Sequence, residues 1–195
     1  MQEEQFSKLS EKIRGSLITP ASGEYEVARQ VYNAMIDRRP AAIVRCVDVA
    51  DVRAAVTFAR QDGLTIAIRG GGHSAAGLGV CEQGLVIDLS PMKGVRVNPA
   101  NRTVRVEPGC TQGDVDHASH VFGLAVPAGI VSTTGIAGLT LGGGTGYLTR
   151  KYGLTIDNLI EADVVLADGS FVTADESHHE DLFWAYAAGE VISAS

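Results

Sequence analysis

The sequence predicts an α+β fold in which short strands alternate with single helices and with two hairpins. Hydrophobic residues make up 45% of the 195 residues and charged residues 20%, as in globular domains with a buried core. Short runs of β-branched residues are separated by turn signals, and only some of these runs are joined by a helical pattern. A doubly wound parallel sheet would require a helix between successive strands, so the mixed pattern favours α+β.

The first 40 residues are predicted to form an N-terminal helical arm, and residues 41–195 to form the main domain. Four apolar side chains of the arm would share one helical face: Val27, Val31, Ala34 and Met35. The sequence Arg38-Arg39-Pro40 would end the arm, because proline cannot continue a helix.

A strand, a helix and a second strand are predicted next. Residues 41–47 read as a short strand, and Asp48 is a suitable N-cap for the helix that follows, with Asp51 three residues further on. Asp62-Gly63 would end this helix. Residues 64–69 then read as a second strand, which leads directly into a glycine-rich turn.

The rest of the chain contains local signals for two hairpins, one strand and two helices, the second of them after a capping-box pattern of Ser177 and Glu180. The predicted strands span residues 85–89, 95–97, 103–106, 161–167 and 170–174. Asp168-Gly169 is a strong hairpin turn. Thr111 and Asp114 form a capping-box pattern for a helix that Gly123 would end.

Two glycine clusters are the strongest functional signal. Gly70-Gly71-Gly72-His73 directly follows a predicted strand, and Gly142-Gly143-Gly144-Thr145-Gly146 lies further along. Glycine lets the backbone turn sharply and approach a ligand closely. The first cluster also fits the dinucleotide fingerprint of a Rossmann fold, but no helical pattern follows it and no helix separates it from Asp88. We therefore interpret the cluster as a nest of backbone N–H groups that binds phosphate.

The bulk composition excludes several other classes of protein. A net charge of -7 argues against a nucleic-acid surface, and no apolar run reaches the roughly 20 residues of a membrane span. The three cysteines are not closely paired, which disfavours a disulfide framework or a zinc site. The polar start at residues 1–5 is unlike a signal peptide, so a cytoplasmic location is expected.

Several ordered motifs resemble the FAD-linked oxidases of the berberine bridge enzyme type. They belong to the larger group whose FAD domain is named after p-cresol methylhydroxylase and vanillyl-alcohol oxidase. The matching segments are Arg69 to Ser74, Val86 to Ser90, Val106 to Gly109, Pro127 to Gly129, Gly138 to Tyr147, Arg150 to Leu154 with Asp157 and Asn158, and Asp181 to Ala185. The resemblance covers residues 40–185.

This resemblance implies a two-lobed FAD-binding domain. In the family the first glycine loop binds the FAD pyrophosphate, and its histidine, here His73, is bonded covalently to the flavin 8α-methyl carbon. Many members carry a second link from a cysteine two residues after Pro-Ala-Gly. That position is Val131 in this chain, so attachment through His73 alone is expected.

The resemblance also implies which residues contact the cofactor, while no catalytic residue and no metal site is assigned. The expected contacts are Arg69, Gly70, Gly71, Gly72, His73, Ser74, Gly77, Ser132, Thr133, Gly135, Gly138, Gly142, Gly143, Gly144, Tyr147 and Asn158. Ordinary structural explanations remain open for several of them. Tyr147 would serve equally well as a core residue, and Asn158 as a turn cap.

In the family a further glycine-rich segment and a substrate domain follow the position of Ala185, so we expect this FAD domain to be incomplete at its C-terminal end. Two functions follow. One is an oxidoreductase of the oxidase type, which transfers hydride from a small organic substrate to flavin N5 and is reoxidised by oxygen. The other is a truncated FAD-binding module without activity of its own. Exposed apolar surface would then be covered by a second copy or by a partner chain.

Overall fold

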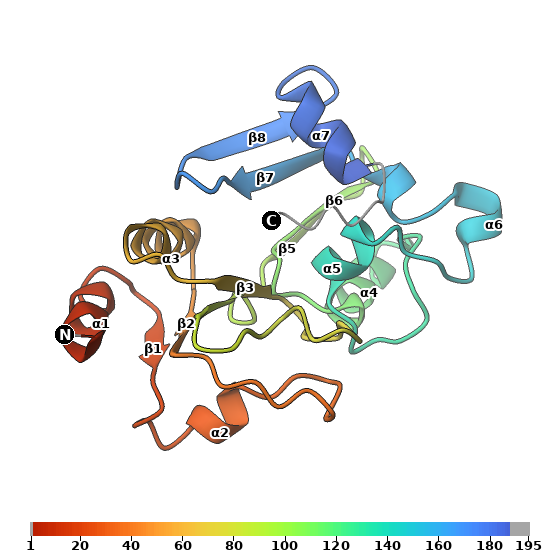
Figure 1. The fold of residues 1–195 in the computed structure, drawn as a ribbon. Coiled ribbons are helices and arrows are strands. Elements are labelled where there is room, and N and C mark those ends of the chain that lie inside the picture. Colours follow the sequence, from red (N-terminus) through yellow and green to blue (C-terminus); the bar gives the residue numbers. More distant parts are fainter. Residues whose placement is uncertain (1, 188–195) are drawn as a thin grey trace. The chain divides into compact units, whose positions relative to one another are not determined.

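The computed structural model describes residues 2–187, which divide into two compact units (Figure 1). Unit 1 comprises Met1–Met92 together with Val165–Phe171, and unit 2 comprises Lys93–Val164 together with Val172–Ser195. Each unit has its own strands and its own buried cluster. The two units are therefore described separately.

Unit 1 is built on a four-stranded mixed sheet in the order β1-β2-β4-β3. Strand β1 pairs antiparallel with β2, whereas β2, β4 and β3 run parallel. The elements of unit 1 are α1 (Gln2–Ser10), β1 (Ser16–Ile18), α2 (Tyr25–Ala28), β2 (Ala42–Arg45), α3 (Val49–Gln61), β3 (Ile66–Arg69) and β4 (Leu85–Asp88).

The inner strands β2 and β4 of unit 1 are buried on both faces, because their alternate residues belong to two different clusters. Val44 and Ile87 pack with α1 and α3, while Ile43 and Val86 pack with residues of β1 and α2. All four residues of β4 are buried. This explains why the first three residues of β4 are a continuous apolar run rather than an alternating one.

Helix α3 begins as the sequence predicts. Its N-cap Asp48 accepts a hydrogen bond from the backbone N–H of Asp51 at 3.0 Å. The carboxylate of Asp51 is itself buried, and it accepts from the backbone N–H groups of Arg14, Gly15 and Val47. Asp51 thus ties the chain before β1 to the start of α3.

The predicted helical arm over residues 1–40 differs from the structure. Residues 16–18 form a sheet strand, and α2 is a single turn, which leaves Val27 71% and Met35 90% exposed. Beyond α2 the backbone donors find distant acceptors, such as the carbonyl of Gly72 for Tyr32 and the Glu82 carboxylate for Arg39. Because these partners satisfy the backbone, the segment gains nothing by continuing as a helix.

Unit 2 contains two pairs of strands, four α-helices and one 3-10 helix among its described residues. Strands β5 and β6 pair antiparallel, and β7 pairs with β8. The elements are β5 (Val95–Asn98), β6 (Thr103–Val106), α4 (Gln112–His120), α5 (Ile136–Leu141), α6 (Thr149–Tyr152), the 3-10 helix η1 (Ile156–Asn158), β7 (Glu161–Val165), β8 (Phe171–Asp175) and α7 (Glu180–Ala187).

The local signals at Thr111, Gly123 and Gly169 are confirmed. Thr111 accepts from the N–H of Asp114, and the Asp114 carboxylate accepts from the N–H of Thr111 at 2.7 Å, so the capping box is complete. Gly123 and Gly169 adopt φ values of 67° and 84°, which L-residues with side chains rarely adopt. The turn around Gly169 belongs to unit 1, where the Gly169 carbonyl accepts from the Arg53 side chain of α3 at 2.8 Å.

None of the helices described between residues 2 and 187 has the length and apolar character needed to cross a membrane. In the same part of the chain, no three histidine, cysteine or acidic side chains converge as metal ligands would.

Candidate cofactor site

The candidate site lies at the carboxyl ends of the three parallel strands of unit 1. Arg45 ends β2, Arg69 ends β3 and Asp88 ends β4, and the sheet register pairs Asp88 with both arginines. Three apolar strands therefore finish in charged side chains at one edge of the sheet. This is the edge at which parallel sheets bind ligands.

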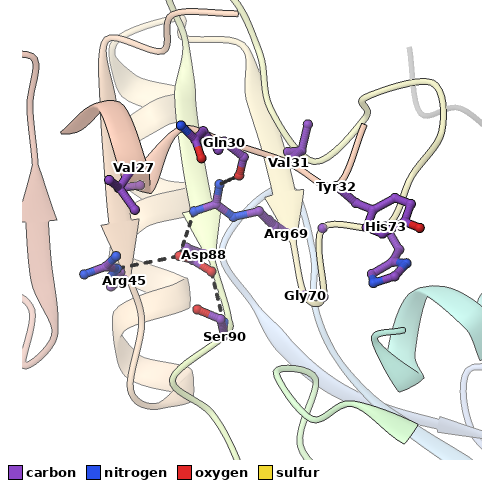
Figure 2. A pocket seen from close by; sticks show the side chains of 13 residues that line it. Val27, Gln30, Val31, Tyr32, Arg45, Arg69, Gly70, His73, Asp88 and Ser90 are labelled. Carbon is purple, nitrogen blue, oxygen red and sulfur yellow. Dashed lines mark hydrogen bonds and ion pairs between the residues drawn. The ribbon is translucent and has the colours of Figure 1, made fainter. Parts of the chain in front are cut away.

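The buried carboxylate of Asp88 organises this edge (Figure 2). Its Oδ2 accepts from Arg69 Nη2 at 2.8 Å, and its Oδ1 accepts from the backbone N–H of Ser90 at 3.0 Å. Arg45 Nε lies 3.8 Å from the same Oδ2. Arg69 also donates to the carbonyl of Gln30 at 3.3 Å. The guanidinium of Arg69 is thus held in place within the protein.

The first glycine loop begins immediately after Arg69. None of the backbone N–H groups from Gly70 to Ser74 donates a hydrogen bond to another residue of unit 1, and Gly72 has a φ of 68°. A run of free N–H groups around a left-handed residue is the arrangement of an anion-binding nest. The loop borders a cavity of about 370 Å³ within unit 1.

His73 follows this nest and also lines the cavity. The ring of Tyr32 stacks on its imidazole, with ring centroids 4.2 Å apart and an angle of 16° between the planes (Figure 2). Neither ring nitrogen of His73 has a hydrogen-bond partner within unit 1. The imidazole edge is therefore free to react, while its face is in contact with Tyr32.

The structure brings together most of the residues predicted in the first loop. Gly70, Gly71, Gly72, His73 and Arg69 all line the cavity, whereas Ser74 and Gly77 do not. The hydroxyl of Ser74 accepts a hydrogen bond from the N–H of Leu78 at 3.2 Å. Gly77 has a φ of 72°, and an added Cβ would lie 2.7 Å from Ile36. In this structure both residues shape the loop rather than the cavity.

The predicted glycines of unit 2 have different local roles. Gly135 is the N-cap of α5 and Gly142 its C-cap, and Gly143 and Gly144 follow with φ values of 94° and 76°. An added Cβ at Gly144 would lie 2.3 Å from the Thr155 hydroxyl oxygen. At Gly138, within α5, an added Cβ would meet no atom within 4 Å. Gly138 is thus not required by its neighbours in the chain.

The other predicted residues of unit 2 lie at its surface. Tyr147 is 87% exposed, so the alternative of a core tyrosine is wrong within this unit. Asn158 donates to the carbonyls of Tyr152 and Leu154, which makes it a turn cap. Ser132 and Thr133 are exposed, as is Val131 at the position where a second flavin link would require cysteine.

Sequence reasoning missed Tyr32 and Arg45 as parts of the site, and it gave Asp88 no role there. The sequence contains a usable signal for Arg45 and Asp88, because each lies at the carboxyl end of an apolar strand. The carboxyl ends of parallel strands meet at one edge of the sheet. No local signal marks Tyr32. Its contact with His73 joins positions 41 residues apart in the chain.

Comparison with known proteins assigns these features to a family. The family model described as FAD binding domain matches residues 40–175. The chain is 38% identical over 182 residues to the FAD-linked oxidoreductase YgaK of Bacillus subtilis (strain 168), covering 91% of this chain and 40% of that protein. Two solved structures are also similar. 6-Hydroxy-D-nicotine oxidase from Arthrobacter nicotinovorans has a TM-score of 0.88 at 34% identity, covering 90% of this chain and 39% of that chain. The berberine bridge enzyme-like protein 1 of Physcomitrella patens has a TM-score of 0.85 at 35% identity, covering 96% and 40%.

The chain spans about 40% of the length of the relatives that it matches. The likeness confirms the α+β, p-cresol methylhydroxylase type of fold and the resemblance seen in the motifs. The free N–H groups after Arg69 fit a cofactor that carries a pyrophosphate. On these grounds the chain belongs to the FAD-binding domain family of the FAD-linked oxidoreductases, with relatives of the berberine bridge enzyme type.

Proposed function

We propose that this chain holds FAD with the pyrophosphate at the loop from Gly70 to Ser74. The observation that carries the proposal is the row of backbone N–H groups with no partner within unit 1. Phosphate oxygens accept hydrogen bonds from such unpaired backbone N–H groups well. Arg69 anchors the start of the loop, because its guanidinium is hydrogen-bonded to Asp88 and to the carbonyl of Gln30.

We further propose that His73 forms the single covalent link to the flavin. Its ring nitrogens are free within unit 1, so the in-plane lone pair of the imidazole is open to act as a nucleophile. One bond forms between a ring nitrogen and the flavin 8α carbon. One C–H of that methyl group and the imidazole N–H are lost. The two electrons released pass to oxygen, which leaves with both protons as hydrogen peroxide.

A separate proposal concerns the second glycine segment, in unit 2, which we expect to contact the cofactor through its own residues. Gly138 supports this role, because within unit 2 nothing occupies the space that a side chain would fill. Glycine within a helix lowers stability by about 0.5–1 kcal/mol relative to alanine. The presence of Gly138 in α5 is therefore better explained by a ligand than by the packing of unit 2. The hydroxyls of Ser132 and Thr133 and the ring of Tyr147 are exposed and available for contacts.

The bound flavin supplies the chemistry of an oxidase, in which N5 accepts a hydride from a small organic substrate and oxygen then removes the electrons. Relatives act on different molecules, as the names (R)-6-hydroxynicotine oxidase and xylooligosaccharide oxidase indicate. Neither name selects a substrate for this chain. The alternative, an FAD-binding module without activity of its own, makes the same prediction for cofactor binding.

The test is whether flavin stays with the protein after acid denaturation. The purified chain is precipitated with acid, run on a denaturing gel and examined for flavin fluorescence. We expect a fluorescent band from the wild type and from His117→Ala, whose exposed histidine lies on α4, and none from His73→Ala. Fluorescence retained in His73→Ala would refute the link. Wild-type protein that takes up no added FAD would refute the cofactor assignment itself.

A further inference from the structure

Tyr32 contacts the proposed attachment residue from a distant part of the sequence. Its ring stacks on the His73 imidazole with the planes 16° from parallel. Two hydrogen bonds flank this stack. The N–H of Tyr32 donates to the carbonyl of Gly72 at 3.0 Å, and the side chain of Asn33 donates to the carbonyl of Ala75 at 2.8 Å. Gly72, directly before the histidine, and Ala75, two residues after it, are therefore hydrogen-bonded to one short segment.

The type of contact matters for the chemistry. The reactive lone pair of an imidazole lies in the plane of the ring, at its edge, whereas stacking covers only the face. A hydrogen bond to the free nitrogen would orient the ring and also occupy the lone pair. The stack restricts the rotation of the His73 side chain and leaves both nitrogens open, since neither has a partner within unit 1.

We infer that Tyr32 is a positioning residue for covalent flavin attachment, an inference that rests on the proposed link through His73. Its aromatic face holds the imidazole in one orientation beside the loop. The phenolic hydroxyl makes no hydrogen bond within unit 1. The aromatic ring of Tyr32 is thus the functional part of the side chain, and phenylalanine should substitute for tyrosine at this position.

The kinetic experiment uses the full chain made without flavin in a riboflavin-starved host. FAD is added in air, and acid-stable flavin fluorescence is followed over time in the wild type, Tyr32→Phe, Tyr32→Leu and Met35→Ala. The last variant is the matched control, because Met35 is 90% exposed in the same segment and does not line the cavity. A misplacement of about 1 Å slows a positioned reaction by up to about 100-fold. We expect Tyr32→Leu to attach flavin at least ~10-fold more slowly than the other three.

A second readout is independent of the cofactor. The chain has only five histidines, so the imidazole protons of His73 are assignable by NMR through the His73→Ala variant. A stacked tyrosine shifts these protons upfield. We expect the shift to persist in Tyr32→Phe and to disappear in Tyr32→Leu. Tyr32 is 72% exposed, so loss of its ring leaves the core intact, and an unchanged melting temperature verifies this.

The possible outcomes separate this inference from the proposal on which it rests. Absence of acid-stable flavin from the wild type would overturn the attachment itself, and the inference with it. Normal attachment in the wild type and an equal rate in Tyr32→Leu would overturn the inference alone. His73 proton shifts that do not change in Tyr32→Leu would do the same, because the stack would then be absent in solution.

Discussion

Replacing Asp88 with asparagine should destabilise unit 1 strongly. The Asp88 and Arg69 side chains are only 3% and 8% exposed, and their charged groups are 2.8 Å apart. Asparagine keeps the shape of aspartate, but it removes the charge and turns an NH₂ group toward one of the two donors, Arg69 or the N–H of Ser90. A charge-assisted hydrogen bond contributes about 1.5–3 kcal/mol, and a guanidinium left buried adds to the loss.

Breaking a buried pair by removing one partner typically costs about 3–5 kcal/mol, and we expect this range for Asp88→Asn. Arg45 compensates little, because it lies 3.8 Å from Asp88 and is held by Glu24 at 2.7 Å. The measurement is urea denaturation of the flavin-free protein followed by circular dichroism. The matched control is Glu24→Gln, which breaks an ion pair whose members are 33% and 54% exposed. The control should cost less than about 1 kcal/mol.

A double replacement sharpens this prediction. Arg69→Met combined with Asp88→Leu removes both charges, so no lone buried charge remains, and it should be less destabilising than Asp88→Asn alone. The argument fails if the free energy of unfolding of Asp88→Asn lies within about 1 kcal/mol of the wild-type value, as is expected for the Glu24→Gln control. The buried pair would then be effectively solvated.

Four further predictions concern two glycines, the pH dependence of stability and the reactivity of a thiol. Gly146→Ala should destabilise the flavin-free protein by about 2–3 kcal/mol in urea denaturation, because the new Cβ would lie 1.8 Å from the Ala128 carbonyl oxygen. Gly138→Ala should instead stabilise it by about 0.5–1 kcal/mol and weaken FAD binding in a titration. Contact with Lys93, then with Thr111, lowers the pKa of Asp114 to about 2. The stability it contributes is therefore present above its unfolded pKa of 3.8 and is lost as pH falls through about 2. Near neutral pH the free energy of unfolding of Asp114→Asn should thus be lower than that of the wild type by about 1 kcal/mol at most, because Asp114 is 40% exposed. Near pH 2 the variant and the wild type should unfold equally easily. Burial raises the pKa of the Cys46 thiol to about 12, so Cys46 should resist thiol reagents at neutral pH until urea unfolds the protein, as mass spectrometry would detect.

The elements that the sequence predicted well are those with short-range causes. The turn at Asp168-Gly169 needs a left-handed residue, and glycine provides it. The start of α4 depends on Thr111 and Asp114, which lie three residues apart and bond to each other. In both cases the residues that determine the structure are also neighbours in the chain, so inspection of a short window is sufficient.

The segment after α2 could not be predicted in this way. Its apolar spacing fits a helix, but its backbone is held by acceptors that lie about 40 residues further along the chain, such as Gly72 for Tyr32 and Glu82 for Arg39. The same long-range contacts create the stack on His73. The family resemblance therefore predicted His73 as the attachment residue, whereas its stacking partner required the fold.

The glycines assigned to the cofactor by family resemblance divide into two physical classes. At Gly144 an added Cβ would lie 2.3 Å from Thr155, and at Gly77 one would lie 2.7 Å from Ile36, so the chain needs these glycines whether or not a ligand binds. Substituting them would lower flavin content through misfolding, and the loss would say nothing of contact. At Gly138 the local structure leaves room for a side chain within unit 2. A decrease in FAD affinity without a decrease in stability is therefore diagnostic at Gly138, and it would mean that the space is kept open for the ligand.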